Sequence, residues 1–370
     1  MRWPVRTHPI FQPPDAVLAD PIDPTRHNVQ MTRRSIFLSI CALFLLAACT
    51  SGDGRQVLIV YSPHGQDLLT KFEDRFEAAN PNVDVQWLDM GSQEVLDRLR
   101  SEKANPQADV WFGGPSSIFL AAAAEDLLAP FTPTWASAVG EYADPGGTYH
   151  AVYLTPLVIA YNSEAIDSAS APQDWDDLLD PEWTDQVLIR DPVASGTMRT
   201  VFGMVMQRGI RQGGDEAGYD WLRRLDGQTR EYVLNPTLLY QKLARQEGLV
   251  TIWDMPDIEE VRSSSGYPLA YLFASSGTPM VEDAIAIVQG TRNLETAKQF
   301  VEFIGSEEEV LVAAREHFRL PARSDLPAEE LPVALRHARE VIRPEPMDWQ
   351  GLHERGAEWM RYWDENIRGR

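Results

Sequence analysis

Short apolar runs alternate with segments of helical periodicity from Gln56 onward, and this order constrains the fold more than any other feature. The runs 57–61, 83–89 and 108–113 have the length and the β-branched or aromatic composition of buried strands. Residues 67–79, which lie between the first two runs, carry apolar side chains at helical spacing and end at Asn80-Pro81. This alternation predicts a parallel sheet covered by helices.

The rhythm changes twice along the chain, and both changes indicate a crossing between two lobes. Residues 149–162 (YHAVYLTPLVIAYN) form extended runs broken by Pro156, and residues 267–288 form two extended runs around a Ser/Gly/Thr turn. Strand and helix patterns alternate again between them. We therefore predict an α/β fold of two lobes with two hinge crossings and a ligand cleft between the lobes. The predicted boundaries are 56–152 with 275–370 for lobe one, and 153–274 for lobe two.

The first 55 residues have a different character. Residues 1–30 are Pro-rich and lack periodicity, so we interpret them as an extension upstream of a start at Met31. Residues 31–48 contain two arginines followed by an apolar run of signal-peptide length, shorter than the ~20 residues of a membrane-spanning helix. Residues 49–55 form a short polar tether. A buried apolar helix is the alternative interpretation of the apolar run.

The sequence Leu46-Ala47-Ala48-Cys49 resembles the lipobox of bacterial lipoproteins. The resemblance implies cleavage before Cys49, attachment of lipid to that residue, and an exported protein anchored in the periplasm or at the cell surface. General and twin-arginine export both remain open, because "TRRSIFL" is close to a twin-arginine signal. The second cysteine, Cys41, lies inside the apolar run, so the chain beyond the signal peptide has no internal disulfide and no cysteine-based metal site.

The charge of the chain excludes one class of partner. The formal net charge is −22 at pH 7. Nucleic-acid binding requires clustered lysines and arginines, and the sequence has no basic stripe of that kind.

Several phrases resemble the solute-binding proteins of bacterial ABC transporters, in the branch of ferric-ion-binding proteins and their phosphonate- and sugar-phosphate-binding relatives. The phrases are VYSPHG, PQADVWFGGPSS, DWDDLLDPEWTDQVLIRDP, SGT and AIAIVQGTRNLETAKQFVEFI, and the resemblance runs from about residue 56 to 320. It implies the type II periplasmic-binding-protein fold and a monomer without a cofactor. It also implies that the lobes close on a small solute and deliver it to a permease in the cytoplasmic membrane.

Resemblance to the ferric members of that branch would imply an iron site whose ligands are a His, a Glu and two adjacent Tyr. His64 stands at the first position. The chain reads Gly113-Gly114-Pro115-Ser116 where the Glu is expected, and Trp253-Asp254 at the place of the tyrosines. Fe(III) prefers anionic oxygen ligands, so we predict no metal site of this kind and keep ferric-ion binding as the alternative function.

Four loops and one crossing supply candidate ligand-binding residues. The stretch LIRDPVASGTMRT (188–200) ends a strand and opens a helix, and free N–H groups at a helix N-terminus favour a phosphate, phosphonate or carboxylate. Asp254 is a candidate acceptor for an ammonium group or for sugar hydroxyls, and Trp253 for stacking on a ring. Helix capping and core packing are the alternative roles. The candidates are Ser62, His64, Gly65, Ser116, Ser117, Thr155, Ser195, Gly196, Thr197, Trp253 and Asp254, with Arg190 and Arg199 as anion partners.

Catalytic motifs are missing from the sequence. It contains no P-loop, G-x-G-x-x-G, H-E-x-x-H or G-x-S-x-G pattern. We therefore predict a binding protein that takes a small anionic solute, and not an enzyme. A ligand-presenting sensor lipoprotein and an enzyme-like member of the fold are the remaining alternatives.

Overall fold

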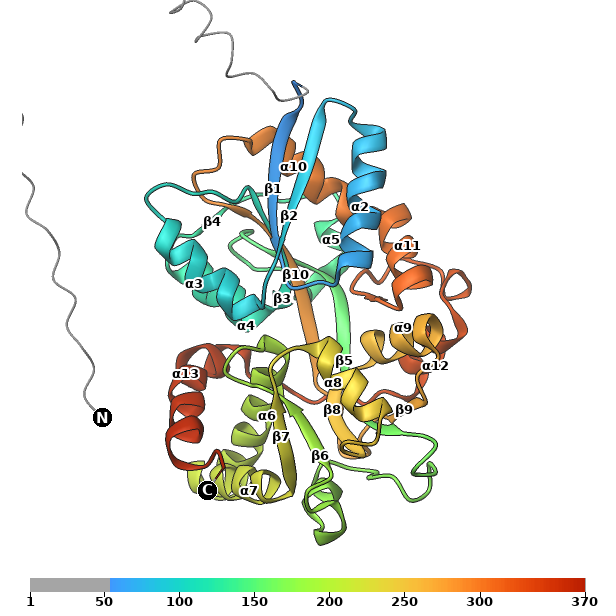
Figure 1. Ribbon diagram of the computed structural model, residues 1–370. Helices are drawn as coiled ribbons and strands as arrows, with labels where there is room; N and C mark the ends of the chain where they lie inside the picture. Colours follow the sequence, from blue (N-terminus) through green and yellow to red (C-terminus); the bar gives the residue numbers. More distant parts are fainter. Residues whose placement is uncertain (1–53, 370) are drawn as a thin grey trace, which may run out of the picture. The chain divides into compact units, whose positions relative to one another are not determined.

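The computed structural model describes residues 54–369, and residues from Arg55 onward form one compact unit (Figure 1). The predicted signal peptide, the predicted lipidation site Cys49 and most of the predicted tether lie outside the described residues. No helix of the described part of the chain is both long and apolar enough to span a bilayer. The unit is an α/β structure with two lobes, as predicted.

Lobe one is built on a mixed sheet. Strands β1 (Gln56–Ser62), β2 (Val83–Asp89) and β3 (Val110–Pro115) are parallel and stand in the order β2-β1-β3. Strand β10 (Met280–Val288) returns from lobe two and pairs antiparallel with β3. The sequence predicted the parallel strands from their alternation with helices.

Helices cover both faces of this sheet. One face packs against α2 (Gln66–Ala79), α10 (Leu294–Ile304), α11 (Glu307–His317) and α12 (Val333–Val341). The other face packs against α3 (Ser92–Glu102) and α4 (Ser116–Ala124). Side chains alternate between the faces along each strand, so that Val60 and Phe112 enter the first layer while Tyr61 and Trp111 enter the second. Short elements complete the lobe: β4 (Leu128–Ala129), α5 (Ala136–Val139) and β11 (Leu320–Pro321).

Strand β5 (His150–Asn162) belongs to both lobes and forms the first crossing. Its first half pairs with β10, and its second half pairs with β8 (Val250–Asp254) and β9 (Leu269–Leu272) of lobe two. Pro156 lies at the change of partners, opposite Met280. The strand continues through this proline, although the sequence suggested an interruption there.

Lobe two continues the same sheet in the order β5-β8-β6-β7. Strands β6 (Val187–Arg190) and β7 (Thr229–Val233) are parallel, and β6 is also parallel to β8. The helices of the lobe are α6 (Gly196–Gln212), α7 (Asp215–Gln228), α8 (Pro236–Ala244) and α9 (Met255–Ser265). Each of α6, α8 and α9 begins directly after a strand, which places three helix N-termini at the same edge of the sheet.

A third segment also passes between the lobes, beside the second crossing. Residues 342–348 lead from α12 to α13 (Trp349–Asn366), and the Thr278 N–H donates to the carbonyl of Arg343. Trp359 and Trp363 of α13 are buried in the lobe-two core. Helix α13 thus contributes to the lobe-two core and also contacts α4 of lobe one, whereas the sequence analysis placed all residues 275–370 in lobe one.

Candidate functional site

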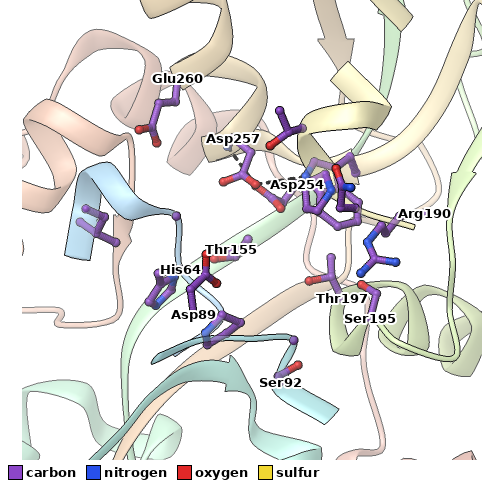
Figure 2. A pocket seen from close by; sticks show the side chains of 18 of the residues that line it. His64, Asp89, Ser92, Thr155, Arg190, Ser195, Thr197, Asp254, Asp257 and Glu260 are labelled. Carbon is purple, nitrogen blue, oxygen red and sulfur yellow. Dashed lines mark hydrogen bonds between the residues drawn. The ribbon is translucent and has the colours of Figure 1, made fainter. Parts of the chain in front are cut away.

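A cavity of about 630 Å³ lies between the lobes, and the N-termini of five helices line it (Figure 2). Helices α2 and α3 come from lobe one, and α6, α8 and α9 come from lobe two. The cause is topological, because every one of these helices follows the carboxyl end of a strand in an open α/β sheet. Partial positive charge from helix N-termini is therefore directed at the cavity from both lobes.

The start of α6 is the part of the cavity best suited to an anion. Ser195 caps the helix by accepting a hydrogen bond from the Met198 N–H at 3.2 Å. The N–H groups of Gly196 and Thr197 have no acceptor among the described residues. Arg190 lies beside them, only 8% exposed, with Nη1 donating to the Val233 carbonyl and Nε without a partner in the described chain. Two free N–H groups and a guanidinium thus converge on one place.

Asp254 and Asp257 form a buried carboxylate pair at the start of α9. Asp254 Oδ1 caps the helix by accepting from the Asp257 N–H at 2.9 Å. Burial and the neighbouring Asp257 raise the pKa of Asp254 well above its usual range. Burial also acts to raise the pKa of Asp257, but Arg319, whose Nη2 lies 2.9 Å from Oδ1, and Tyr240 bring that pKa below its usual value. Asp257 is therefore paired, whereas Asp254 has no cation of its own.

Two further carboxylates line the cavity from the lobe-one side. Asp283 accepts hydrogen bonds from the Gly114 N–H at 2.8 Å and from the Thr155 hydroxyl at 2.5 Å, and burial raises its pKa. Burial and the charge of Glu94 raise the pKa of Asp89. Asp283 is buried, and the ionised form of a buried carboxylate is costly, so Asp283 favours a positive charge in the cavity; Asp89 is exposed and carries less of this cost.

Carboxylates outnumber cations on the cavity wall. The acidic side chains are those of Asp67, Asp89, Asp254, Asp257, Glu260 and Asp283, and the basic ones are those of Arg190 and Arg319. Burial lowers the pKa of His64 to about 3, so its ring is neutral at physiological pH. The cavity therefore combines an anion-binding corner with an overall excess of negative charge.

Most of the residues predicted from the sequence lie on this cavity. Those on its wall are His64, Gly65, Thr155, Arg190, Ser195, Gly196, Thr197, Trp253 and Asp254. Some of these side chains are already engaged elsewhere. The His64 ring packs against Phe112 at 4.6 Å, and Trp253 Nε1 donates to Tyr240 Oη at 2.7 Å.

Four predicted residues do not line the cavity. Ser62 Oγ accepts from the His64 N–H, and Ser116 Oγ donates to Glu282 Oε2 at 2.6 Å. Ser117 is buried in α4. Arg199 donates to Gln93 and to two backbone carbonyls of its own loop. Ser62 and Ser116 therefore form hydrogen bonds within the protein, but neither is the helix cap that was the alternative.

Sequence reasoning missed the loop between β2 and α3 and several charged residues of the wall. Gly91 and Ser92 follow strand β2 and precede a helix, which is the signal that identified the other loops. The predicted site nevertheless did not include them. Asp257 and Glu260 lie one turn and two turns into α9. Arg319 has no local signal, because it reaches the cavity from the segment after α11.

The described residues contain no group of three or more His, Cys, Asp and Glu side chains arranged to hold a metal ion. Two buried tyrosines lie near the cavity, but neither resembles a phenolate ligand. Tyr240 Oη donates to Asp257, and burial raises the pKa of both Tyr240 and Tyr153 well above the usual value. The described residues contain no adjacent pair of tyrosines, which is the pair expected for the ferric site.

Comparisons with known proteins agree with the fold. Residues 106–351 match the family model of the bacterial extracellular solute-binding proteins. A Sinorhizobium fredii protein named as an ABC-transporter periplasmic-binding protein is 26% identical over 84% of this chain and 86% of its own length. A Salmonella typhimurium protein named as a 2-aminoethylphosphonate-binding periplasmic protein is 27% identical over 85% of this chain and 93% of its own.

The fold also matches solved structures. The periplasmic binding protein AfuA of Actinobacillus pleuropneumoniae, solved with fructose-6-phosphate, superimposes with a TM-score of 0.75 at 24% identity, over 86% of this chain and all of that one. The family model covers well over half of the sequence, and the two-lobed fold and the interlobe cavity agree with it. The chain belongs to the bacterial extracellular solute-binding proteins.

Proposed function

We propose that this protein is the solute-binding component of an ABC importer and that its solute is a small zwitterion. The solute carries a phosphonate, phosphate or carboxylate at one end and an ammonium group at the other. The observation that carries the proposal is the combination of unlike groups in one cavity: a guanidinium and free N–H groups at α6, and an uncompensated Asp254 at α9.

Support for the anionic end comes from donors that are otherwise unused. The N–H groups of Gly196 and Thr197 have no acceptor in the described chain, and Arg190 Nε is buried without a partner. Buried donors of this kind cost free energy until they meet an acceptor. A phosphonate or carboxylate placed at the start of α6 accepts from the two N–H groups, gains from the helix dipole and lies beside the positive charge of Arg190.

Support for the cationic end comes from the excess of carboxylates. Asp254, Asp283 and Asp89 each have a raised pKa, chiefly because burial disfavours the ionised form, and Arg319 offsets this only in part for Asp254 and Asp283. An ammonium group supplies a further cation. A purely anionic solute satisfies α6 but leaves these carboxylates unpaired, so we favour a zwitterion over a simple anion.

The name of one relative agrees with this chemistry. The Salmonella protein is named for 2-aminoethylphosphonate, a compound with a phosphonate and an ammonium group. We adopt that compound as a probe of the class and leave the natural solute to the experiment.

A thermal-shift screen tests the proposal. The compounds are aminoalkylphosphonates, amino acids, sugar phosphates, simple alkylphosphonates and ferric citrate. At one common concentration, zwitterions are expected to give the largest stabilisation, about 2.7 kcal/mol where that concentration is a hundred times their Kd, because ligand binds only the folded state. A shift with ferric citrate and with none of the organic compounds contradicts the proposal and supports the ferric alternative. Conversion of a bound compound into product supports the enzyme-like alternative.

The location and the partner follow from the family and from the N-terminal sequence. We propose that the protein is exported, anchored by lipid on Cys49, and docks on a permease of the cytoplasmic membrane. Replacement of Cys49 by Ala is expected to move the protein from the membrane fraction to the soluble exported fraction, since stable anchoring requires the acyl chains. Mass spectrometry of the N-terminal peptide checks the modification directly. An unmodified Cys49, or a C49A protein that stays in the membrane fraction, contradicts the anchor.

A further inference from the structure

We infer that Ser92 and the N-terminus of α3 in lobe one form the second half of the anion subsite, and that Gly91 and Gly196 set the distance at which the two lobes close on it. The inference rests on the proposed function and assigns a role to a loop that sequence reasoning missed. Ser92 and the N-terminus of α3 would contact the anionic group from lobe one, opposite the contacts made by α6.

The first observation is a pair of reciprocal close approaches between the lobes. A Cβ atom on Gly196 of α6 would overlap Ser92 Oγ and would lie 3.0 Å from Ile118 Cδ1. A Cβ atom on Gly91, at the start of α3, would lie 2.9 Å from the carbonyl oxygen of Ala194. Each glycine thus gives space to an atom of the other lobe, and a Cβ at either position requires a neighbour to move: side-chain atoms of lobe one at Gly196, and the backbone carbonyl of Ala194 at Gly91.

The second observation is an unpartnered hydroxyl. Ser92 is only 5% exposed and lines the cavity, yet its Oγ has no hydrogen-bond partner among the described residues. It lies across from Ser195 and Thr197 in Figure 2. Because this hydroxyl lies next to Gly196 on the cavity wall, it is available to donate to an anion held at the start of α6.

The third observation is that α3 lacks a side-chain cap. Its N-cap residue is Gly91, and the N–H groups of Ser92 and Gln93 have no acceptor in the described chain. Helix α6, in contrast, is capped by Ser195. An anion between the two helices therefore meets the positive ends of both, one from each lobe.

The fourth observation is a hydrogen bond that joins the same two helices outside the cavity. Arg199 Nη1 of α6 donates to Gln93 Oε1 of α3 at 2.8 Å. The other donors of Arg199 reach the carbonyls of Pro192 and Val193, so its guanidinium is held on the loop before α6. Arg199 thus links the N-terminal turns of α3 and α6 outside the cavity. It does not make the direct contact with the anion that was predicted for it.

These contacts couple binding to closure. The donors of α6 are present in lobe two alone, but Ser92 and the α3 N–H groups reach the anion only when the lobes approach. The anion stabilises the closed form by the interactions that it gains from lobe one, which is the condition for a ligand to shift a two-state equilibrium.

Two variants and two matched controls test the inference, with 2-aminoethylphosphonate as the probe. Ser92→Ala removes the hydroxyl, and Gly196→Ala introduces the interfering Cβ. Ser101→Ala, on the exposed face of the same helix α3, and Gly227→Ala, in α7 with no atom within 4 Å of the added Cβ, are the controls. Titration calorimetry gives Kd, and small-angle scattering gives the radius of gyration with and without the probe.

We expect Ser92→Ala to weaken binding about tenfold, the loss of one hydrogen bond to a charged group. We expect Gly196→Ala to weaken binding at least tenfold and to increase the radius of gyration of the unliganded protein. Both controls should stay within twofold of the wild type. Affinities of both variants within twofold of the wild type overturn the inference.

Scattering separates failure of the inference from failure of the proposed function. If the wild type does not bind the probe, the zwitterion proposal has failed, and the unliganded proteins still test the close approach. A Gly196→Ala protein more open than both the wild type and Gly227→Ala supports the glycine contact. Equal radii of gyration in all three overturn it.

Discussion

Asp254 stabilises helix α9 as its N-cap, but the buried charge of the same side chain opposes folding. It caps α9 through the Asp257 N–H, and it leaves a buried carboxylate on the cavity wall without a cation. Because burial raises its pKa in the folded protein, its ionisation opposes folding. The protonated carboxyl does not oppose folding, so its contribution to stability is fully present below the ordinary carboxylate pKa of about 4. That contribution is lost as the pH rises toward the raised pKa of the folded protein.

Asp254→Asn should therefore stabilise the unliganded protein at neutral pH. Asparagine keeps the N-cap and removes the charge, so we expect a gain of about 1–3 kcal/mol in the free energy of unfolding. The gain should grow from about pH 4 upward. Urea unfolding of both proteins at several pH values measures it, and binding of 2-aminoethylphosphonate should weaken in the same variant.

Asp348→Asn is the matched control, because Asp348 caps α13 in the same way, away from the cavity. It should change neither the pH dependence nor the affinity. An Asp254→Asn protein that is less stable than the wild type at pH 7, with unchanged affinity, would show that Asp254 is only a helix cap.

Among the elements, the segment 342–348 links the lobes in a way that the sequence did not indicate. Glu345 is buried and accepts from Arg208 at 2.5 Å and from Arg211 at 2.8 Å, both on α6. Its N–H donates to the carbonyl of Thr278 in the second crossing. The segment therefore fixes α6, the helix with the anion-binding N-terminus, to the hinge.

Glu345→Ala should destabilise the protein by about 1–3 kcal/mol, because it leaves two arginines without their carboxylate. The loss is no larger because both arginines are partly exposed to solvent. Urea unfolding checks this value. Glu295→Ala, which removes a surface pair with Lys298, should change stability by less than about 0.5 kcal/mol. Equal effects of the two substitutions would contradict a structural role for the segment.

At this scale the strand and helix pattern was predictable, and the partners of the elements were not. Apolar runs and helical spacing identified the strands and helices of both lobes because burial leaves that period in the sequence. Trp359 and Trp363 indicated that α13 buries one face, but periodicity does not say against which lobe. The segment 342–348 has no period at all, so the third passage between the lobes was not predicted.

In the whole molecule, the site exists only where the two lobes meet. Arg319 of lobe one pairs with Asp257 of lobe two, and His317 lies 3.3 Å from Glu260, on the side of the cavity that α9 forms. Residues 62 positions apart in sequence thus share one charge network. The loops that follow strands were predictable as site residues, since that placement is general for α/β sheets. Which of their charges are compensated was not predictable, because compensation depends on the packing of one lobe against the other.

The central claim is that the cavity selects a solute with both an anionic and a cationic end. Titration calorimetry with 2-aminoethylphosphonate and with ethylphosphonate, which lacks only the amino group, tests it most directly. The account predicts one site per chain for the first compound and at least about 100-fold weaker binding of the second, a difference of about 2.7 kcal/mol. Equal affinities, or binding of neither compound together with binding of ferric citrate, would contradict it.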